Sequence, residues 1–324
     1  MRGAKQGLLP PAVAAKLRAV RKVLAGLLLC ALPAPAAGQT PLRVELLDTA
    51  VLAARRLTES SGVASSTRVH GVLWTHNDSG DEPRLYATDS VGHDLGSVRI
   101  AGAKNVDWED MAPGPCAGTV APCLFVADIG DNARRRRTVV IYELSEPVPP
   151  LAPSDTARQT QLRSATLLRY PDRPHDAEAL VVEPSGTMMI ITKELVGRAR
   201  VYRVPPHGNA QRAGQVATLQ FVSQLALAPS LPRMRLVTGA AVSPDGGTLV
   251  VRTYSSLHFY RLHGDSLPTP LTPPEGLPIP VVEPQGEGVA FAGPDRLVLT
   301  SERGRADHSL MSRLRILGLP HAEP

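Results

Sequence analysis

The sequence predicts an all-β protein, a β-propeller with five recognisable repeats of four strands each. A six-residue sequence motif, which we call the recurring phrase, occurs five times along the chain with substitutions. Its copies begin roughly 50 to 70 residues apart, a spacing typical of propeller blades. The runs between the copies are short, rich in Val, Ile, Leu, Thr and Tyr, and bounded by Gly, Pro, Asn or Asp, as β-strands are. After residue 38 the sequence has no amphipathic helical pattern of ordinary length.

The recurring phrase places polar or acidic residues directly before an apolar pair that starts a strand. Because the first strand of each propeller blade lines the central channel, each copy is predicted to begin a channel-lining strand. The copies occupy residues 59–64 (Glu-Ser-Ser-Gly-Val-Ala), 107–112 (Asp-Trp-Glu-Asp-Met-Ala), 176–181 (Asp-Ala-Glu-Ala-Leu-Val), 237–242 (Val-Thr-Gly-Ala-Ala-Val) and 285–290 (Gln-Gly-Glu-Gly-Val-Ala).

Further strand-like runs follow each copy, separated by turn residues. Asn-Asp-Ser-Gly-Asp at 77–81 and Pro-Asp-Gly-Gly at 244–247 are strong turn signals. The predicted strands lie at 72–75, 85–88 and 95–100 in the first unit; 124–128, 138–144 and 165–170 in the second; 188–192, 200–204 and 216–227 in the third; 242–251, as a hairpin, and 257–261 in the fourth; and 296–300 and 312–317 in the fifth.

The fifth unit is one strand short, whereas residues 42–47 (Leu-Arg-Val-Glu-Leu-Leu) form a spare strand before the first unit. If this segment supplies the missing strand, the ring closes and no sheet edge stays open between the chain ends. Six blades remain an alternative if one unit has diverged beyond recognition. The Pro-rich stretches 147–153 and 268–284 read as surface loops, so residues 39–324 are predicted to form one propeller domain.

The first 38 residues have the composition of a secretory signal peptide. They contain six basic residues and no acidic residue, then an apolar run at 23–32 and a small-residue stretch at 33–38. The apolar run is too short to span a bilayer, and no later segment is longer and equally apolar. We therefore expect a secreted or periplasmic protein, a monomer without a membrane span in its mature part.

The charge of the chain changes when the leader is set aside. The whole chain has 35 basic and 30 acidic residues, a net charge of +5, whereas without the six leader cations 29 basic residues oppose 30 acidic ones, a net charge of −1. The high pI therefore belongs to the leader, and the mature composition gives no reason to expect nucleic acid as a partner.

Two cysteines remain after the leader, Cys116 and Cys123, with six residues between them. In an exported chain an isolated pair of this kind favours a disulfide. A zinc site would need further Cys or paired His residues nearby, and the sequence has none.

Two sets of polar residues are predicted to meet at one mouth of the channel. The first set begins the channel-lining strands, and the second follows the next strand of each unit, one hairpin later. Together the predicted face contains Glu59, Asn77, Asp78, Asp107, Glu109, Asp128, Asp131, Asn132, Asp176, Glu178, Lys193, Glu194, Arg252, Glu287 and Glu302, with His175 beside it as a weaker candidate for proton transfer.

Carboxylate, amide and backbone oxygens are the ligands of a hard cation such as Ca²⁺, which takes six to eight of them. Such an ion can polarise an ester or phosphoester and activate water, while carboxylates alone can act as an acid–base pair or hold polyols. The metal ligands we expect are Glu109, Asp128, Glu178 and Glu287. The alternative for each single residue is a structural role, in which an acidic side chain caps a strand or bonds loop N–H groups.

Six stretches spread over most of the mature chain give it a resemblance to a known group. The chain resembles exported bacterial β-propellers grouped as "esterase-like activity of phytase" and SdiA-regulated proteins, most of which have no established activity. The resemblance implies the propeller fold and an acidic face of the Ca²⁺-binding type, but no particular substrate. The stretches are 74–79 (Trp-Thr-His-Asn-Asp-Ser), 107–112, 127–132 (Ala-Asp-Ile-Gly-Asp-Asn), 175–180 (His-Asp-Ala-Glu-Ala-Leu), 238–246 and 283–288 (Glu-Pro-Gln-Gly-Glu-Gly).

Two hypotheses of function follow from the sequence. In the first, the acidic mouth holds Ca²⁺ and binds a polar small molecule or a protein partner without turnover. In the second, the same face is the active site of a Ca²⁺-dependent hydrolase of ester or phosphoester bonds. The sequence shows no complete pair of nucleophile and base, which favours the first hypothesis.

Overall fold

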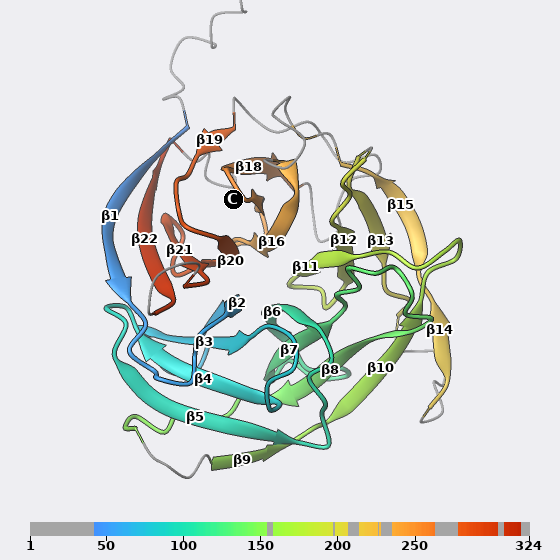
Figure 1. Ribbon diagram of the computed structural model, residues 1–324, viewed down its shortest axis with the longest axis horizontal. Helices are drawn as coiled ribbons and strands as arrows, with labels where there is room; N and C mark the ends of the chain where they lie inside the picture. The colour runs from blue at the N-terminus through green and yellow to red at the C-terminus, as the bar shows by residue number, and fades with distance from the viewer. Residues whose placement is uncertain are drawn as a thin grey trace, which may run out of the picture. The chain divides into compact units, whose positions relative to one another are not determined.

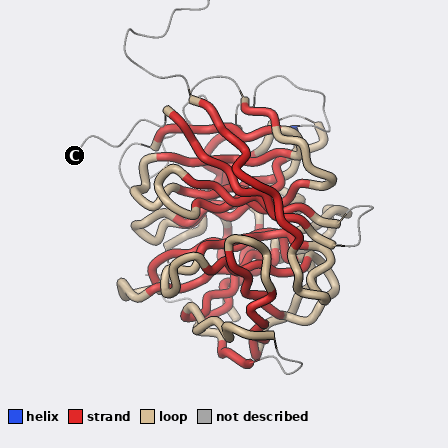
Figure 2. The backbone as a smooth tube through the Cα atoms, turned by 90° about the vertical axis from the view of Figure 1, so that its left-hand side faces the viewer, coloured by secondary structure: helices blue, strands red, loops and turns tan. Residues whose placement is uncertain are grey.

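The computed structural model describes residues 42–153, 158–196, 198–206, 214–225, 227, 235–262, 278–303 and 308–318. Strands account for most of the backbone in these ranges, and none of it is α-helical (Figure 2). Among the described residues, no helix has the length and apolar character needed to cross a membrane. The predicted signal peptide lies outside the described residues and stays a prediction.

The strands form five separate sheets, which we number as blades 1 to 5. Blade 1 contains β2 (Ser60–Ser65), β3 (Val72–Asn77), β4 (Arg84–Asp89), β5 (Asp94–Ala101) and β9 (Arg158–Gln161); blade 2 contains β6 (Trp108–Pro115), β7 (Pro122–Asp128), β8 (Val139–Ser145), β10 (Ser164–Arg169) and β14 (Val216–Thr218); blade 3 contains β11 (Ala177–Val182), β12 (Met188–Thr192), β13 (Arg200–Arg203) and β15 (Gln220–Gln224); blade 4 contains β16 (Val237–Val242), β17 (Thr248–Thr253), β18 (Ser256–Arg261) and β19 (Ile279–Pro280); and blade 5 contains β20 (Gly286–Phe291), β21 (Arg296–Ser301), β22 (Leu310–Leu317) and β1 (Arg43–Val51).

The five sheets are arranged in a ring around a central channel. The innermost strands β2, β6, β11, β16 and β20 each contact the next one in this order, and β20 contacts β2 (Figure 1). Each innermost strand is the one that the recurring phrase begins. The prediction of an all-β propeller with five blades is therefore confirmed, and the six-blade alternative is wrong.

The ring is closed by pairing of the two ends of the described chain. β1 runs antiparallel to β22, from Arg43 opposite Leu317 to Val51 opposite Leu310, with an irregularity between Leu46 and Asp48 (Figure 1). The spare strand predicted at 42–47 thus completes blade 5, and it continues four residues further than predicted. Asp48 also forms an ion pair with Arg313 on β22.

Two blades contain a fifth strand that the sequence pattern did not indicate. β9 pairs parallel to β5, and β14 pairs parallel to β10, each as the outermost strand of the preceding blade (Figure 1). β9 lies within the blade 2 segment of the chain, and β14 lies within the predicted run at 216–227, which breaks into β14 and β15. Blades 1 and 2, and blades 2 and 3, are therefore connected at the outside of the ring as well as at the channel.

The hydrophobic core is divided among the blade interfaces. Five buried clusters lie between blades 1 and 2, 2 and 3, 3 and 4, 4 and 5, and 5 and 1. Their members alternate along the strands, so that each sheet buries both faces against its neighbours. Trp74 and Trp108, both fully buried, belong to the cluster between blades 1 and 2. The indole N–H of Trp108 donates to the carbonyl of Lys104, which makes this tryptophan a core residue and not a ligand platform.

The disulfide predicted between Cys116 and Cys123 is present. It joins the end of the β6–β7 hairpin, with 4.9 Å between the two Cα atoms. Both cysteines are buried in the cluster between blades 2 and 3. The bridge therefore closes one hairpin at the end of the channel opposite to the phrase residues.

Candidate functional site at the channel mouth

Each innermost strand has a β-bulge near its start, within the recurring phrase. Bulges redirect side chains and are common beside functional sites. The pairing of the first and second strands shifts between Ser60 and Val63, Trp108 and Asp110, Ala177 and Ala179, Val237 and Gly239, and Gly286 and Val289. The residue at the bulge is the third residue of four phrase copies, namely Ser61, Glu109, Glu178 and Glu287, and the second residue, Thr238, of the copy at 237–242.

The bulge residues of blades 1 and 4 are hydroxyls that bind the neighbouring strand. Ser61 Oγ donates to the carbonyl of Glu109 at 2.6 Å, and Thr238 Oγ1 donates to the carbonyl of Glu287 at 3.1 Å. The other three bulge residues are glutamates, all buried. The propeller symmetry therefore presents three carboxyl groups to the channel at equivalent positions.

Five carboxylates gather at the mouth of the channel on the side of blades 1 to 3. Glu109, Asp176 and Glu178 each offer one oxygen, and these atoms lie within 4.8 Å of one another. Asp78, Asp107 and Glu109 form a second group of the same kind, so Glu109 belongs to both. We call these five residues the carboxylate cluster.

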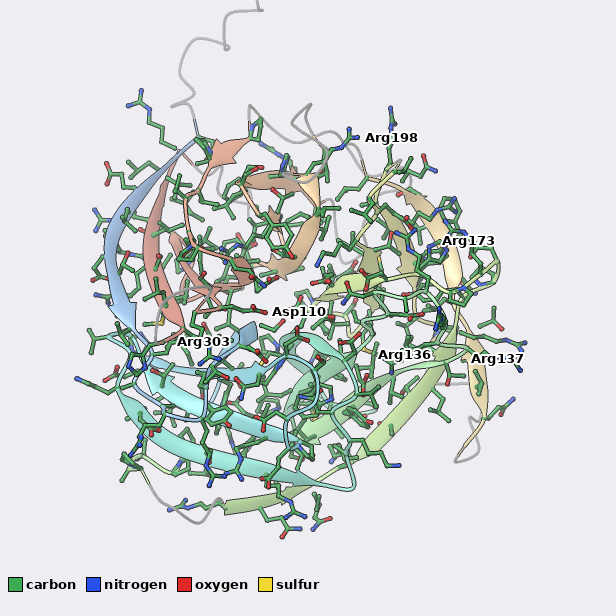
Figure 3. The ribbon with its side chains drawn as sticks, viewed as in Figure 1. Asp110, Arg136, Arg137, Arg173, Arg198 and Arg303 are labelled. Carbon is green, nitrogen blue, oxygen red and sulfur yellow. A yellow bond between two sulfur atoms is a disulfide. The ribbon has the colours of Figure 1, made fainter. Side chains whose placement is uncertain are left out.

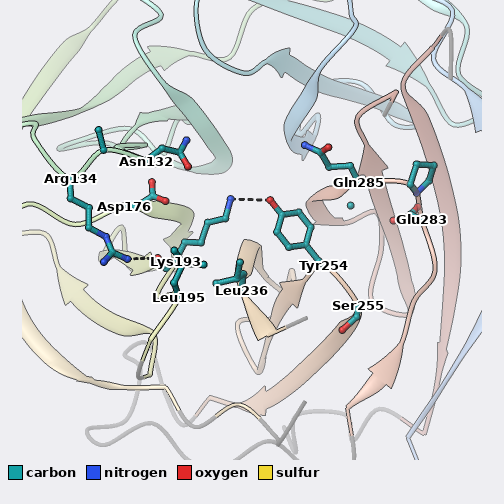
Figure 4. Close-up of a pocket in the computed structure, with 13 residues that line it drawn as sticks. Asn132, Arg134, Asp176, Lys193, Leu195, Leu236, Tyr254, Ser255, Glu283 and Gln285 are labelled. Carbon is teal, nitrogen blue, oxygen red and sulfur yellow. Dashed lines mark hydrogen bonds between the residues drawn. The ribbon is translucent and has the colours of Figure 1, made fainter. Parts of the chain in front are cut away.

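One lysine provides a positive charge inside the cluster. Lys193, directly after β12, donates from Nζ to Glu178 Oε1 at 2.6 Å and to the hydroxyl of Tyr254 at 3.0 Å (Figure 4). Burial alone would lower the pKa of Lys193, but the charges of Glu178 and Tyr254 and the hydrogen bonds to both side chains together outweigh burial and raise this pKa above its ordinary value. Lys193 is therefore a fixed ammonium group beside Glu178.

Burial and mutual repulsion make the acidic groups hard to ionise. Burial raises the pKa of Glu109 and of Glu287 well above the usual carboxyl range, and the charge of Glu178 raises both further. Burial raises the pKa of Glu178 to about 7, although Lys193 acts in the opposite direction. Burial also raises the pKa of Asp107 to about 6. The site holds more carboxylates than its own cations neutralise.

Glu287 has an unused acceptor. Its side chain is 4% exposed, and Oε2 has no hydrogen-bond partner among the described residues. The charges that act on it are those of Glu178, Lys193, Glu302 and Arg252, and the first three belong to the same mouth. A buried carboxylate oxygen without a partner is costly unless something outside the chain satisfies it.

A cavity of about 660 Å³ opens beside the carboxylate cluster. Its size is that of a small-molecule site. Asp176 belongs to both the cavity wall and the cluster, and the side chain of Lys193 extends between Asp176 and Tyr254 (Figure 4). The polar residues that line the cavity are Asn132, Arg134, Asp176, Lys193, Tyr254, Ser255, Glu283 and Gln285.

Several predicted face residues instead hold the loops in place. Asn77 Oδ1 accepts from the backbone N–H groups of Thr58 and Glu59 at 2.9 and 3.0 Å. Asp131 accepts from the N–H of Arg136 at 2.7 Å. Asn77 and Asp131 therefore have the structural role that the sequence left open as an alternative, in which a polar side chain bonds loop N–H groups.

Asp128, one of the four expected metal ligands, lies outside both carboxylate groups. Its oxygens accept from the N–H groups of Val106 and Asp107, each at 3.2 Å, and form an ion pair with Arg136 at 2.7 Å. The carboxylate already has a partner on each oxygen, so we leave it out of the candidate ligand set.

Arg252 is fully buried and does not serve as a free cation at the face. Its Nη1 donates to the carbonyls of Gly288 and Thr300 at 2.6 and 2.8 Å, and its Nη2 pairs with Glu283. A Cβ atom at Gly286 would lie 1.9 Å from this guanidinium, so the close approach requires glycine there. Arg252 thus ties blade 4 to blade 5.

His175 is fully buried with both ring nitrogens bonded. Nδ1 lies 2.8 Å from Glu194 Oε1, and Nε2 lies 3.1 Å from Asp172 and 3.0 Å from the hydroxyl of Tyr202. Glu194 also pairs with Arg134 at 3.2 Å. This network joins two loops of the mouth and supports Arg134, and the ring of His175 does not reach the cavity.

The remaining predicted residues lie at the mouth without joining the cluster. Glu302 accepts from Gln285 Nε2 at 2.5 Å, and burial together with the charges of Asp78 and Glu59 raises its pKa to about 7. Asn132 is exposed and lines the cavity.

Two residues of the site were not among the predicted ones. Tyr254 directly follows β17, just as Lys193 directly follows β12. The two positions are equivalent because the last residue of each strand, Thr253 or Thr192, lies opposite the first residue of the innermost strand of its blade. Aligning the second strands of the repeats would have found it. Asp110 lies within the phrase itself, yet only the structure shows that its carboxylate is turned into the ring.

Comparison with known proteins leaves the family open. No protein-family model matches the chain, and no curated protein matches it. Among solved structures the chain is similar to the PQQ-bound form of aldose sugar dehydrogenase from Streptomyces coelicolor, with 15% sequence identity and a TM-score of 0.49, over 88% of this chain and 100% of that chain. A similarity of this degree carries no inference about cofactor or reaction, so the function is argued from the site.

The raised carboxyl pKa values predict an unusual dependence of stability on pH. In the unfolded chain Glu178 and Glu302 titrate near 4.5, whereas in the folded protein their pKa values are about 7. The folded state therefore keeps protons that the unfolded state has released, so stability should fall as pH rises from about 4.5 to about 7. Melting temperatures measured in EDTA across this range test the sign.

The matched variant is Glu178→Gln combined with Glu302→Gln, which removes two of the groups with a raised pKa and should make the decline shallower, while Asp107, Glu109 and Glu287 keep the rest of it. Carboxylates whose pKa is lowered, such as Asp172 and Glu194, lose their contribution only below pH 4.5 and do not affect this window. A melting temperature that rises steadily from pH 4.5 to 7 would contradict the assignment.

Proposed function

We propose that the carboxylate cluster binds a hard divalent cation, best matched by Ca²⁺, and that the cavity beside it holds a polar ligand. The observation that carries the proposal is the approach of Glu109, Asp176 and Glu178 oxygens within 4.8 Å of one another in a buried position. Carboxylate oxygens are the ligands that Ca²⁺ prefers, and its flexible coordination suits an irregular set of donors.

The electrostatics of the mouth support this proposal. Carboxyl groups that crowd together in a buried place either stay protonated or need a compensating cation. Lys193 supplies one positive charge, whereas five carboxylates form the cluster and Glu287 faces it. The unpartnered Oε2 of Glu287 offers a further acceptor. A divalent ion would relieve the repulsion, so the residues present fit such an ion.

The residues proposed to hold the cation are Glu109, Asp176 and Glu178, with Asp78 and Asp107 on the side of blade 1. The ion would supply a positive centre that can polarise an oxygen of a ligand. The chain's own contribution is to orient that ligand, because Arg134, Lys193 and Gln285 line the adjoining cavity.

A hydrolase of ester or phosphoester bonds is the second candidate. The observation that favours it is the position of the cavity directly beside the carboxylate cluster, so that an ester bound there would lie next to a cation that polarises it and activates water. Assays of the purified protein on chromogenic esters and phosphoesters, with Ca²⁺ and with EDTA, separate the two candidates. Ca²⁺-dependent turnover that Glu178→Gln abolishes would favour the hydrolase, and cation binding without turnover would favour the binding protein.

Ca²⁺ should raise the melting temperature of the protein. A ligand that binds only the folded state at 100 times its Kd stabilises that state by about 2.7 kcal/mol. Glu109→Gln should abolish the Ca²⁺-dependent increase, since it removes the carboxylate shared by both groups, and should stabilise the metal-free protein by relieving repulsion. Differential scanning fluorimetry and isothermal titration with Ca²⁺ provide the measurements.

The control is Glu45→Gln, which removes the same charge from an exposed position on β1 and should leave the Ca²⁺ response intact. An unchanged melting temperature with Ca²⁺, Mg²⁺ and Mn²⁺ alike would overturn the cation site. The carboxylates would then be a proton-sharing structural cluster.

A further inference from the structure

Three loops at the mouth of the channel contribute a set of exposed arginines. The loops are 129–138 after β7, 170–176 after β10 and, among the described residues, 193–196 and 198–199 after β12. β7 and β12 end opposite the first residues of β6 and β11, so their loops lie at the same end of the ring as the carboxylate cluster. The end of β10 pairs with the start of β8, which places the loop 170–176 at this end as well.

The three loops form one connected surface. The N–H of Asp131 donates to Asp176 Oδ1 at 2.9 Å, and Arg134 pairs with Glu194 at 3.2 Å. His175 in turn contacts Glu194. Each contact joins two different loops, so the arginines that the loops display are held in a fixed arrangement.

Four arginines on this surface are exposed, and we call them the arginine rim: Arg135, Arg137, Arg173 and Arg198. In the described part of the chain none of them forms an ion pair. The acidic residues of the loops have other partners: Asp172 contacts His175 and Arg200, and Glu194 contacts His175 and Arg134. Figure 3 shows Arg137, Arg173 and Arg198 spread along the same side of the ring.

The spread of the rim points to an extended anionic ligand. A small anion would meet one arginine at a time, whereas a chain with repeated charges can meet several. The planar guanidinium pairs with carboxylates through two parallel hydrogen bonds. Positive charge on an exposed surface also speeds the encounter with an anionic partner. The rim thus fits a polymer that carries carboxylates at intervals.

The cavity adjoining the rim suits a hydroxyl-rich unit of that polymer. Asn132 and Gln285 offer amides, Tyr254 offers a hydroxyl, and Asp176 offers a carboxylate at its wall. These groups donate to and accept from hydroxyls, which an acidic peptide lacks along most of its length. Arg134, at the edge of the cavity, connects it to the loop that carries Arg135 and Arg137.

We propose that the arginine rim and the adjoining cavity bind an acidic polysaccharide whose charges are carboxylates. The proposal names the class of polar ligand for the proposed binding function and rests on it for the cavity. The rim contacts do not require the cation, because they are made by side chains outside the carboxylate cluster, whereas Asp176 belongs to both the cavity and the cluster.

The test measures binding of a short fluorescent oligogalacturonate in EDTA by fluorescence polarisation. EDTA removes Ca²⁺, so failure of the cation site cannot produce a negative result here, and the Ca²⁺ melting experiment contains no saccharide. We expect binding that weakens with added salt, and a loss of about tenfold for Arg137→Gln combined with Arg173→Gln. Neutral dextran should not compete.

The matched control is Arg43→Gln combined with Arg99→Gln, two exposed arginines on β1 and β5 that change the net charge equally. It should alter the affinity by less than about twofold. An equal loss in both double variants would show non-specific attraction and overturn the proposal. Polyglutamate or single-stranded DNA competing as well as unlabelled oligogalacturonate, or no binding at low salt, would also overturn it.

Discussion

A chain that begins at Thr49 is expected to lose cooperative unfolding or to melt far below the chain that keeps all of β1. The deletion removes the pairs that Arg43, Val44, Glu45, Leu46 and Asp48 make with β22. At about 1 kcal/mol net for each of these five pairs, the loss is roughly 5 kcal/mol, a large part of the stability of an ordinary domain.

The deletion also exposes an unpaired edge of β22, a template for aggregation. The control is a chain that begins at Leu42, which keeps β1 and should have the same melting temperature as a chain that begins at residue 39. Thermal unfolding followed by circular dichroism, with light scattering for aggregation, gives the comparison. Equal melting temperatures for the chains beginning at Leu42 and Thr49 would show that the closure contributes little.

Asp110→Ala is expected to destabilise the protein by at least about 3 kcal/mol, because each buried donor left unsatisfied costs about 1–3 kcal/mol. The carboxylate of Asp110 is fully buried near the centre of the ring (Figure 3). It accepts from the N–H groups of Met111 and Leu180, both at 2.8 Å, and of Ala240 at 3.4 Å. These donors belong to the innermost strands of three blades, so one side chain connects blades 2, 3 and 4.

Asp110→Asn should cost less than Asp110→Ala, since its amide oxygen still accepts while its NH₂ group faces a donor. Asp295→Ala, at a half-exposed position, is the control and should stay within about 0.5 kcal/mol of the natural chain. Urea unfolding midpoints at constant slope give the free energies. A midpoint for Asp110→Ala close to that of Asp295→Ala would mean that water replaces the carboxylate without cost.

The repeat pattern by itself determined the architecture. Strand formation and turn chemistry are local properties, so short apolar runs between Gly, Pro, Asn and Asp identified most strands, and a regular spacing identified the blades. Counting strands in each unit then required residues 42–47 to complete the fifth blade. The bridge between Cys116 and Cys123 followed from their short separation in a chain with a predicted export signal.

Only the tertiary structure decided which polar residues share the mouth and which are already bonded. Asp128, Arg252 and His175 have the residue types of a site, but each finds partners on a neighbouring loop or blade. The parallel strands β9 and β14 and the five equivalent bulges depend on contacts between distant segments. A sequence pattern records the side chains in chain order, whereas burial, pairing and repulsion depend on which segments the closed ring brings together.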